Sequence, residues 1–140
     1  MLDWEEVREM IFKTIRQEQD WRYLVEKEAM IVPVVMMAAE WCGRMFGKQL
    51  VLTSIHRTEM EHRDMLAGLG IAYYPTVHMY WRGVDLRSWI YTPDEIRKLE
   101  TMLNGRFDYG RSKKVAVYHD IGAGVHLHLQ VPEMCGVWRP

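Results

Sequence analysis

The stretch Val125-His126-Leu127-His128-Leu129-Gln130-Val131 decides how the C-terminal half of this chain folds. Apolar and polar side chains alternate along it, and successive side chains of a β-strand point to opposite faces. The sequence therefore predicts a strand with one face in the core and a polar face that carries His126, His128 and Gln130. Two imidazoles on one face can reach a common centre, as metal ligands or proton carriers. The alternative is an exposed strand face that carries two histidines by chance.

A second polar pair lies upstream, in His78-Met79-Tyr80-Trp81-Arg82-Gly83-Val84-Asp85. Residues 83–90 have the pattern of a strand, and Asp85 falls on the face opposite its apolar neighbours. A histidine and a carboxylate on either side of a turn at Gly83 can converge on one ion, and nitrogen and oxygen ligands suit zinc. This spacing alone is common by chance. Together with His128 on a neighbouring polar strand face, it predicts a metal site with an open position for water.

The fold class expected from the whole chain is α+β, as one domain over residues 1–140. An antiparallel sheet would carry the metal site and pack against N-terminal and intervening helices. Residues 1–48 are expected to be mainly helical, 49–132 to form the core that carries the site, and 133–140 to form a tail. The expected helices span 3–15, 20–27, 33–46, 58–69 and 92–104, and the expected strands span 50–55, 83–90, 113–119 and 125–131.

Composition narrows the function classes. The 140 residues are 49% hydrophobic and 26% charged, as in ordinary globular proteins. Eighteen basic residues against 19 acidic ones argue against a nucleic-acid partner. The longest uncharged run, residues 29–39, is far shorter than the ~20 residues of a membrane span. No secretory signal is recognisable, and two cysteines fit a reducing compartment. We therefore expect no nucleic acid, no membrane and a cytoplasmic site of synthesis.

The two histidine motifs, preceded by Thr53-Ser54-Ile55-His56-Arg57, resemble a known family. They are similar to the zinc peptidase superfamily of D-alanyl-D-alanine carboxypeptidases, murein endopeptidases, lysostaphin and hedgehog domains. The nearest type is the D-Ala-D-Ala carboxypeptidase, which includes small phage endolysins. The resemblance covers roughly Leu50 to Val131. It implies a zinc peptidase that hydrolyses peptidoglycan stem peptides or cross-links with metal-activated water. A phage enzyme of this kind reaches the cell wall at lysis without a signal peptide.

The resemblance also implies roles for individual residues around the metal. His78, Asp85 and His128 would be the zinc ligands. The first histidine of the His-x-His pair, His126, would stabilise the transition state or transfer the proton as the catalytic group beside the metal.

One position departs from the carboxypeptidase pattern. Enzymes of this type often place a glutamate, the general base, three residues before the last ligand histidine, and here that position is Val125. We expect the side chain of Val125 to point into the core, so it leaves the base unassigned. Asp120, in the loop before the strand, is a substitute proton acceptor and our second catalytic candidate.

Three further residues are candidates for substrate binding. Arg57 matches a family arginine that binds a substrate carboxylate, a task suited to a planar guanidinium. Ser54 precedes it in the same motif, and His119 would line the substrate groove or orient a ligand. The remaining histidines, His56 and His62, have no metal-ligand spacing and are expected to be ordinary surface residues.

Three other functions remain open at this point. A non-catalytic zinc-binding interaction domain of the same fold, as in a phage structural or accessory protein, would keep the ligands and lose the base. A metal-dependent nuclease would need a basic groove. A structural protein with incidental histidines would bind no metal.

Overall fold

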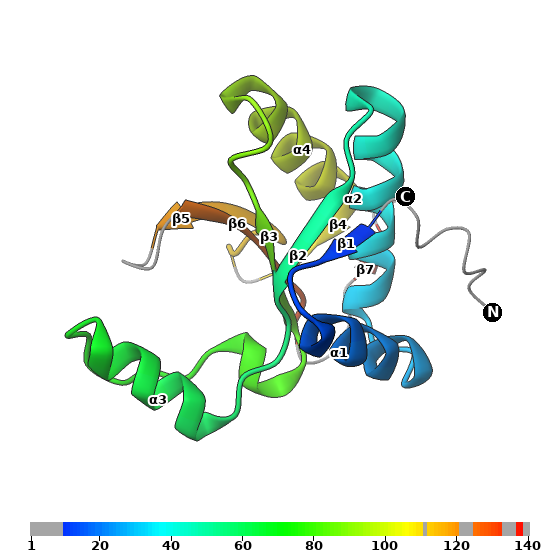
Figure 1. The fold of residues 1–140 in the computed structure, drawn as a ribbon. Helices are drawn as coiled ribbons and strands as arrows, with labels where there is room; N and C mark the ends of the chain where they lie inside the picture. The colour runs from blue at the N-terminus through cyan, green and yellow to red at the C-terminus, as the bar shows by residue number, and fades with distance from the viewer. Residues whose placement is uncertain (1–9, 111, 121–124, 133–136, 139–140) are drawn as a thin grey trace.

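A five-stranded mixed sheet organises the chain in a computed structural model that describes residues 10–110, 112–120, 125–132 and 137–138 (Figure 1). The strand order is β1-β2-β3-β6-β5; β1 is parallel to β2 and the other neighbours are antiparallel. The strands are β1 (Met10–Phe12), β2 (Leu50–Ser54), β3 (Gly83–Arg87), β5 (Ala116–Asp120) and β6 (Val125–Gln130). The short strands β4 (Phe107–Asp108) and β7 (Val137–Trp138) form a separate pair. The expected α+β class is confirmed, although β1 makes the sheet mixed.

The helices form two groups around this sheet. They are α1 (Ile15–Glu26), α2 (Ile31–Phe46), α3 (Glu59–Gly68), α4 (Pro93–Arg106) and the short 3-10 helix η2 (Val77–Tyr80). Figure 1 shows α2 and α4 close together and α3 standing apart from both, on the other side of the molecule. The core therefore lies between the sheet and the side that carries α2 and α4, with Trp21 and Leu24 of α1 included in it. The opposite face of the sheet is left for the site.

Two of the expected helices, α3 and α4, begin at capping boxes, in which a threonine is followed three residues later by a glutamate, a pattern visible in the sequence. The hydroxyl oxygen of Thr58 accepts the backbone N–H of Glu61 at 3.1 Å, and Thr92 accepts that of Glu95 at 3.1 Å. In each case the glutamate side chain accepts the threonine backbone N–H in return. Gly47 ends α2 with a φ of 62°, a left-handed conformation that favours glycine.

The prediction of a helix over residues 3–15 is wrong for Met10–Phe12. These residues form β1, which pairs with residues 50–52 of β2. The helical spacing of apolar residues here cannot reveal a three-residue strand, because its hydrogen-bond partners lie about forty residues away. Residues 1–9 lie outside the described part of the chain. Helix α1 then begins at Ile15 rather than near Asp20, with Thr14 as its N-cap.

The alternation of β3 and β6 separates a core face from a polar face. The buried core residues on β2, β3 and β6 are Leu50, Leu52, Val84, Leu86, Leu127 and Leu129. The polar face carries Asp85, His126 and His128. The expectation that Val125 points into the core is wrong, because 46% of this residue is exposed. It begins β6, at a point that the helices packed on the core face do not cover.

Helix α1 is tied to the loop between β2 and α3 by one arginine. A terminal nitrogen of Arg16, Nη2, donates to the backbone oxygen of His56 at 2.9 Å and to Glu61 Oε1 at 2.9 Å. Hydrogen bonding to Arg16 lowers the pKa of Glu61 to about 2. The N-terminal helical part therefore braces the loop that carries Arg57.

Helix α2 is the most apolar helix, and its apolar residues are largely buried in the core. Within the described ranges, no helix by itself has both the length and the apolar character needed to cross a membrane. Helices α1 and α2 meet those criteria only when they are joined across a bend of 119°.

Gly83 is a point of close approach between β3, η2 and β6. A Cβ atom at this position would lie 2.5 Å from Val77 Cγ2 and 3.2 Å from His128 Cε1. We expect Gly83→Ala to reduce the free energy of unfolding by about 1–3 kcal/mol, because one of these neighbours must move. Chemical denaturation measures this change. The matched control is Gly68→Ala at the end of α3, where nothing lies within 4 Å. Equal stabilities of the two variants would contradict the close approach.

Candidate metal centre

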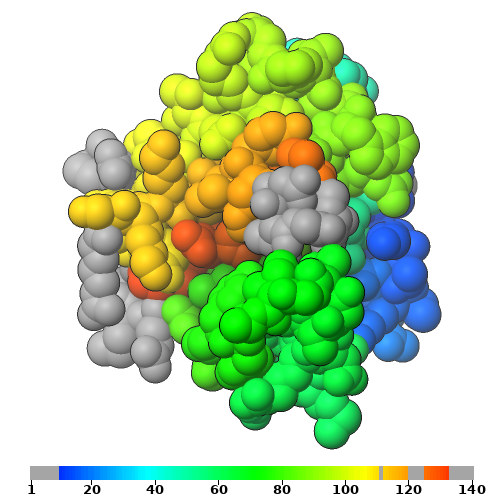
Figure 2. Space-filling view, turned by 90° about the vertical axis from the view of Figure 1, so that its left-hand side faces the viewer, coloured from blue at the N-terminus to red at the C-terminus, as the bar shows by residue number. Residues whose placement is uncertain are grey.

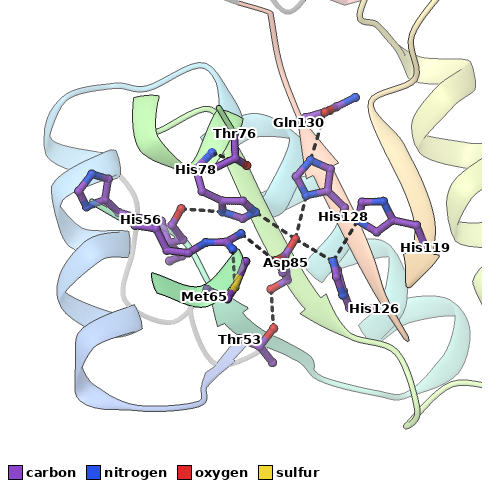
Figure 3. A network of polar contacts seen from close by, with 12 residues as sticks. Thr53, His56, Met65, Thr76, His78, Asp85, His119, His126, His128 and Gln130 are labelled. Carbon is purple, nitrogen blue, oxygen red and sulfur yellow. Dashed lines mark hydrogen bonds and ion pairs between the residues drawn. The ribbon is translucent and has the colours of Figure 1, made fainter. Parts of the chain in front are cut away.

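Three buried side chains from three elements meet at the centre of the polar face: His78 of η2, Asp85 of β3 and His128 of β6 (Figure 3). Their exposed fractions are 1%, 7% and 7%. His78 Nε2 lies 3.2 Å from Asp85 Oδ1, and His128 Nδ1 lies 2.8 Å from the same oxygen. One ligand atom from each residue lies within 4.8 Å of the others, so this group can hold a metal ion.

The backbone places these residues together through strand register. Asp85 and His128 are paired across β3 and β6, so their side chains lie side by side on the same face. The hydroxyl of Thr53 on β2 donates to the backbone oxygen of Asp85 at 3.2 Å, near a register shift between β2 and β3. Helix η2 starts at its N-cap Thr76 and brings His78 over the strands.

The hydrogen bond of His78 to the backbone fixes which ring nitrogen carries a proton. Nδ1 lies 2.9 Å from the backbone oxygen of Ile55, and this oxygen can only accept. Nδ1 therefore carries the hydrogen. In the neutral ring, the lone pair of Nε2 then faces Asp85.

The same reasoning applies to His128 through Gln130. The Gln130 amide nitrogen donates to the backbone oxygen of Lys114 at 2.8 Å, so its amide oxygen is the atom that lies 3.1 Å from His128 Nε2. That oxygen accepts, so Nε2 carries the hydrogen. In the neutral ring, the lone pair of Nδ1 then faces Asp85. Such outer partners orient metal-binding histidines in many proteins.

When both rings are neutral, Asp85 Oδ1 therefore faces two nitrogen lone pairs. Three acceptors in one buried place repel one another unless a proton or a metal ion lies among them. Burial alone would raise the pKa of Asp85, but when His78 and His128 are protonated, their charges and hydrogen bonds outweigh it and hold this pKa well below its usual range. The donor set of two imidazoles and one ionised carboxylate fits a divalent transition metal.

Two more histidines adjoin this cluster. His126 Nε2 lies 3.5 Å from Asp85 Oδ1 and 3.0 Å from His119 Nε2, as the close-up in Figure 3 illustrates. One of the two facing nitrogens must donate the hydrogen of that second contact. Burial, together with the charges of His128 and His126, lowers the pKa of His119. A pair of coupled imidazoles thus lies within reach of the cluster.

A groove of about 550 Å³ opens over the four histidines. Figure 2 shows the hollow, with β6 at its floor between the α3 side and the segment that leads into β5. Tyr74, Pro75 and Thr76 line it on the α3 side, and Lys113 and Lys114 on the other. The cluster is therefore open to a ligand from one direction.

Arg57 lines this groove and contacts Asp85. Its Nη2 lies 3.8 Å from Asp85 Oδ2, and its Nη1 donates to Met65 Sδ at 3.0 Å. Burial lowers the pKa of Arg57 and the charge of Asp85 opposes this shift. Ser54 is the register partner of Asp85 on β2, but it is not among the described residues that line the groove. The backbone of Asp120 ends β5, and its side chain lies outside the described part of the chain.

Two expectations about histidines are corrected, and one residue was missed. His62 is 1% exposed rather than at the surface, because α3 packs it against Tyr74, whose backbone oxygen lies 2.8 Å from Nε2. His56 is half-buried and stacks on Trp81, with ring centroids 4.0 Å apart. The missed residue is Gln130, which orients His128. The sequence contained a signal for this role, because strand alternation places Gln130 on the same face as His126 and His128.

No family model, curated protein or solved structure matches this chain. The function must therefore be argued from the geometry of the site and the pattern of its residues.

We expect about one divalent metal ion per chain after loading and dialysis, and less than a tenth of that in His128→Ala, because two ligands rarely hold such an ion. Elemental analysis measures the metal content. His56→Ala is the matched control, since it removes a histidine outside the cluster. A wild-type chain that binds no metal while folded, or a His128→Ala variant that retains it, would contradict the assignment.

Proposed function

We propose that this protein is a zinc-dependent peptidase that hydrolyses peptide bonds of peptidoglycan stem peptides or cross-links. The observation that carries the proposal is the convergence of two histidine ring nitrogens on the Asp85 carboxylate at the floor of an open groove. Catalytic zinc sites have three protein ligands and keep one position open for water or substrate. A structural zinc site would have a fourth protein ligand instead.

The substrate class is supported by the order of the motifs. The sequence His78-x6-Asp85 followed by His126-x-His128 is similar to that of the zinc peptidase superfamily described above. In the structure the three histidines of these motifs lie around Asp85 Oδ1. Asp85, His126 and His128 are on the adjacent antiparallel strands β3 and β6, and His78 is on helix η2. The resemblance in sequence order is thus matched by proximity in space.

The roles proposed for the chain follow from positions in the groove. Zinc at this site would supply Lewis acidity and an activated water. His126 lines the groove beside Asp85. We assign to it the stabilisation of the developing negative charge or the transfer of a proton to the leaving amine. His119 positions His126 through the 3.0 Å contact between their Nε2 atoms. Arg57 is held near the metal ligands, where it can bind a substrate carboxylate.

One observation favours the non-catalytic zinc domain as a second candidate. The position of the family glutamate is held by Val125, whose exposed side chain belongs to the strand face opposite His126. A valine cannot accept a proton. The peptidase proposal therefore depends on His126 as the group that handles the proton.

We expect His126→Ala to keep its metal and to lose about 100-fold or more in kcat/KM for muropeptide hydrolysis, a typical loss for an acid–base group. His128→Ala should lose both metal and activity. The measurement is chromatography of cleaved muropeptides alongside elemental analysis. His56→Ala again serves as the control that keeps both.

Two outcomes would contradict the proposal. The first is full activity in His126→Ala with zinc bound. The second is a zinc-loaded wild-type chain that cleaves no muropeptide, which would favour the non-catalytic domain.

A further inference from the structure

We infer that the groove selects substrates that carry a carboxylate about two residues from the bond that is cut, and that Lys113 and Lys114 bind this carboxylate. The inference rests on the peptidase function proposed above and assigns a substrate chemistry to the same groove. Three features of the described residues support it: charge, position along the strand and local anchoring.

Positive charge collects in the groove although the chain as a whole is slightly acidic. The net charge is −1, yet three described lining residues are basic, namely Arg57, Lys113 and Lys114. Asp85 is the one acidic group among the described residues that line it, and its carboxylate belongs to the metal cluster. A bound divalent ion would add further positive charge. A groove of this sign attracts anionic ligands and disfavours cationic ones.

The lysines lie at one end of the groove, past the metal cluster. The Gln130 side chain donates to the backbone oxygen of Lys114 at 2.8 Å, and the Gln130 backbone donates to that of Val115 at 2.8 Å. His126 and His119 are paired at the opposite end of the same strands. The lysine segment thus adjoins Gln130, two strand positions beyond His128.

This spacing sets the position of the carboxylate in a substrate. Two residues of a strand span ~7 Å, and an extended peptide lying along the groove covers the same distance in two residues. A substrate whose scissile carbonyl is at the metal therefore places an acidic group near the lysines when that group is about two residues away. Arg57 lies beside Asp85, closer to the cluster, so it would contact a different part of the substrate.

The lysine segment is anchored locally. Lys113 donates its backbone N–H to Gly110 at 3.1 Å, and its Nζ lies 5.6 Å from the ring centroid of Tyr109. The carbonyl of Lys114 is held by Gln130, which also orients the metal-binding His128. The opposite wall of Tyr74, Pro75 and Thr76 offers no charge. The backbone that carries Lys113 and Lys114 is therefore fixed at one edge of the groove, and both side chains are exposed there.

The test uses two stem peptides that differ in one side chain, glutamate or glutamine, two residues from the cleaved bond. The zinc-loaded wild-type chain should bind and cleave the glutamate peptide about tenfold better, as expected for two ion pairs at an exposed rim. In the double variant Lys113→Gln/Lys114→Gln, the ratio of the values for the glutamate and glutamine peptides should fall close to one. Calorimetry measures binding and chromatography measures cleavage, while elemental analysis checks that zinc is retained.

The matched control is Lys27→Gln. Lys27 is an exposed lysine whose Nζ lies 5.7 Å from the ring centroid of Tyr23, much as Lys113 lies over Tyr109. It is on the N-terminal side of the molecule, outside the described lining of the groove. This variant removes one positive charge of the same kind and should keep the wild-type preference. Added salt should weaken the wild-type preference, because exposed charges are screened.

The outcomes separate this inference from the proposed function. A preference that survives in the double variant, or that is absent from the wild type, overturns the lysine subsite. Loss of the preference in Lys27→Gln to the same extent as in the double variant would also overturn the lysine subsite. A preference in binding that depends on the two lysines, with no cleavage of either peptide, supports the subsite and overturns the peptidase.

Discussion

The site depends on one constraint: a buried carboxylate oxygen of Asp85 faces two histidine nitrogens, and in the neutral rings neither of these nitrogens carries a hydrogen. The backbone oxygen of Ile55 and the amide oxygen of Gln130 each occupy the other nitrogen of these rings as hydrogen-bond acceptors. A neutral ring in this setting has no proton left for Asp85. Only a proton taken up from solvent or a metal ion can relieve the repulsion among the three atoms. Hydrogen-bonding groups outside the cluster therefore orient the two histidine ligands.

Much of the surrounding fold serves to hold those outer groups. The register of β3 and β6 aligns Asp85 with His128, and the close approach at Gly83 lets η2 bring His78 over the strands. Arg16 of α1 binds the backbone beside Ile55, so the N-terminal helix supports the carbonyl that orients His78. A change in any of these parts alters the metal centre without touching a ligand.

Patterns within one element allowed most of the fold to be predicted from the sequence. Strict alternation located β6 and put His126, His128 and Gln130 on one face, and the capping boxes located the starts of α3 and α4. The prediction failed where long-range pairing decides the structure, as in β1, whose three residues are strand only because β2 lies beside them. It also failed for His62, because its burial comes from packing against the loop at Tyr74.

For the site too, patterns within one element were predictable from the sequence and contacts between distant elements were not. Spacing on two strands indicated which side chains face the metal, since pleating fixes that direction. The approach of Lys113 and Lys114 to the groove could not be foreseen, because it depends on the hydrogen bond between the Gln130 side chain and the backbone of Lys114. The partnership of His119 with His126 likewise follows from the pairing of β5 with β6.

The most direct test of this account is thermal unfolding of the wild type and Asp85→Asn, each with and without zinc, at mildly alkaline pH where free histidine is neutral. An asparagine amide can donate to the histidine lone pairs that a carboxylate repels. The account predicts that, without zinc, the variant unfolds at the same or a higher temperature than the wild type. It also predicts that zinc raises the unfolding temperature of the wild type alone. A metal-free wild type that is clearly more stable than the variant and does not respond to zinc would contradict it.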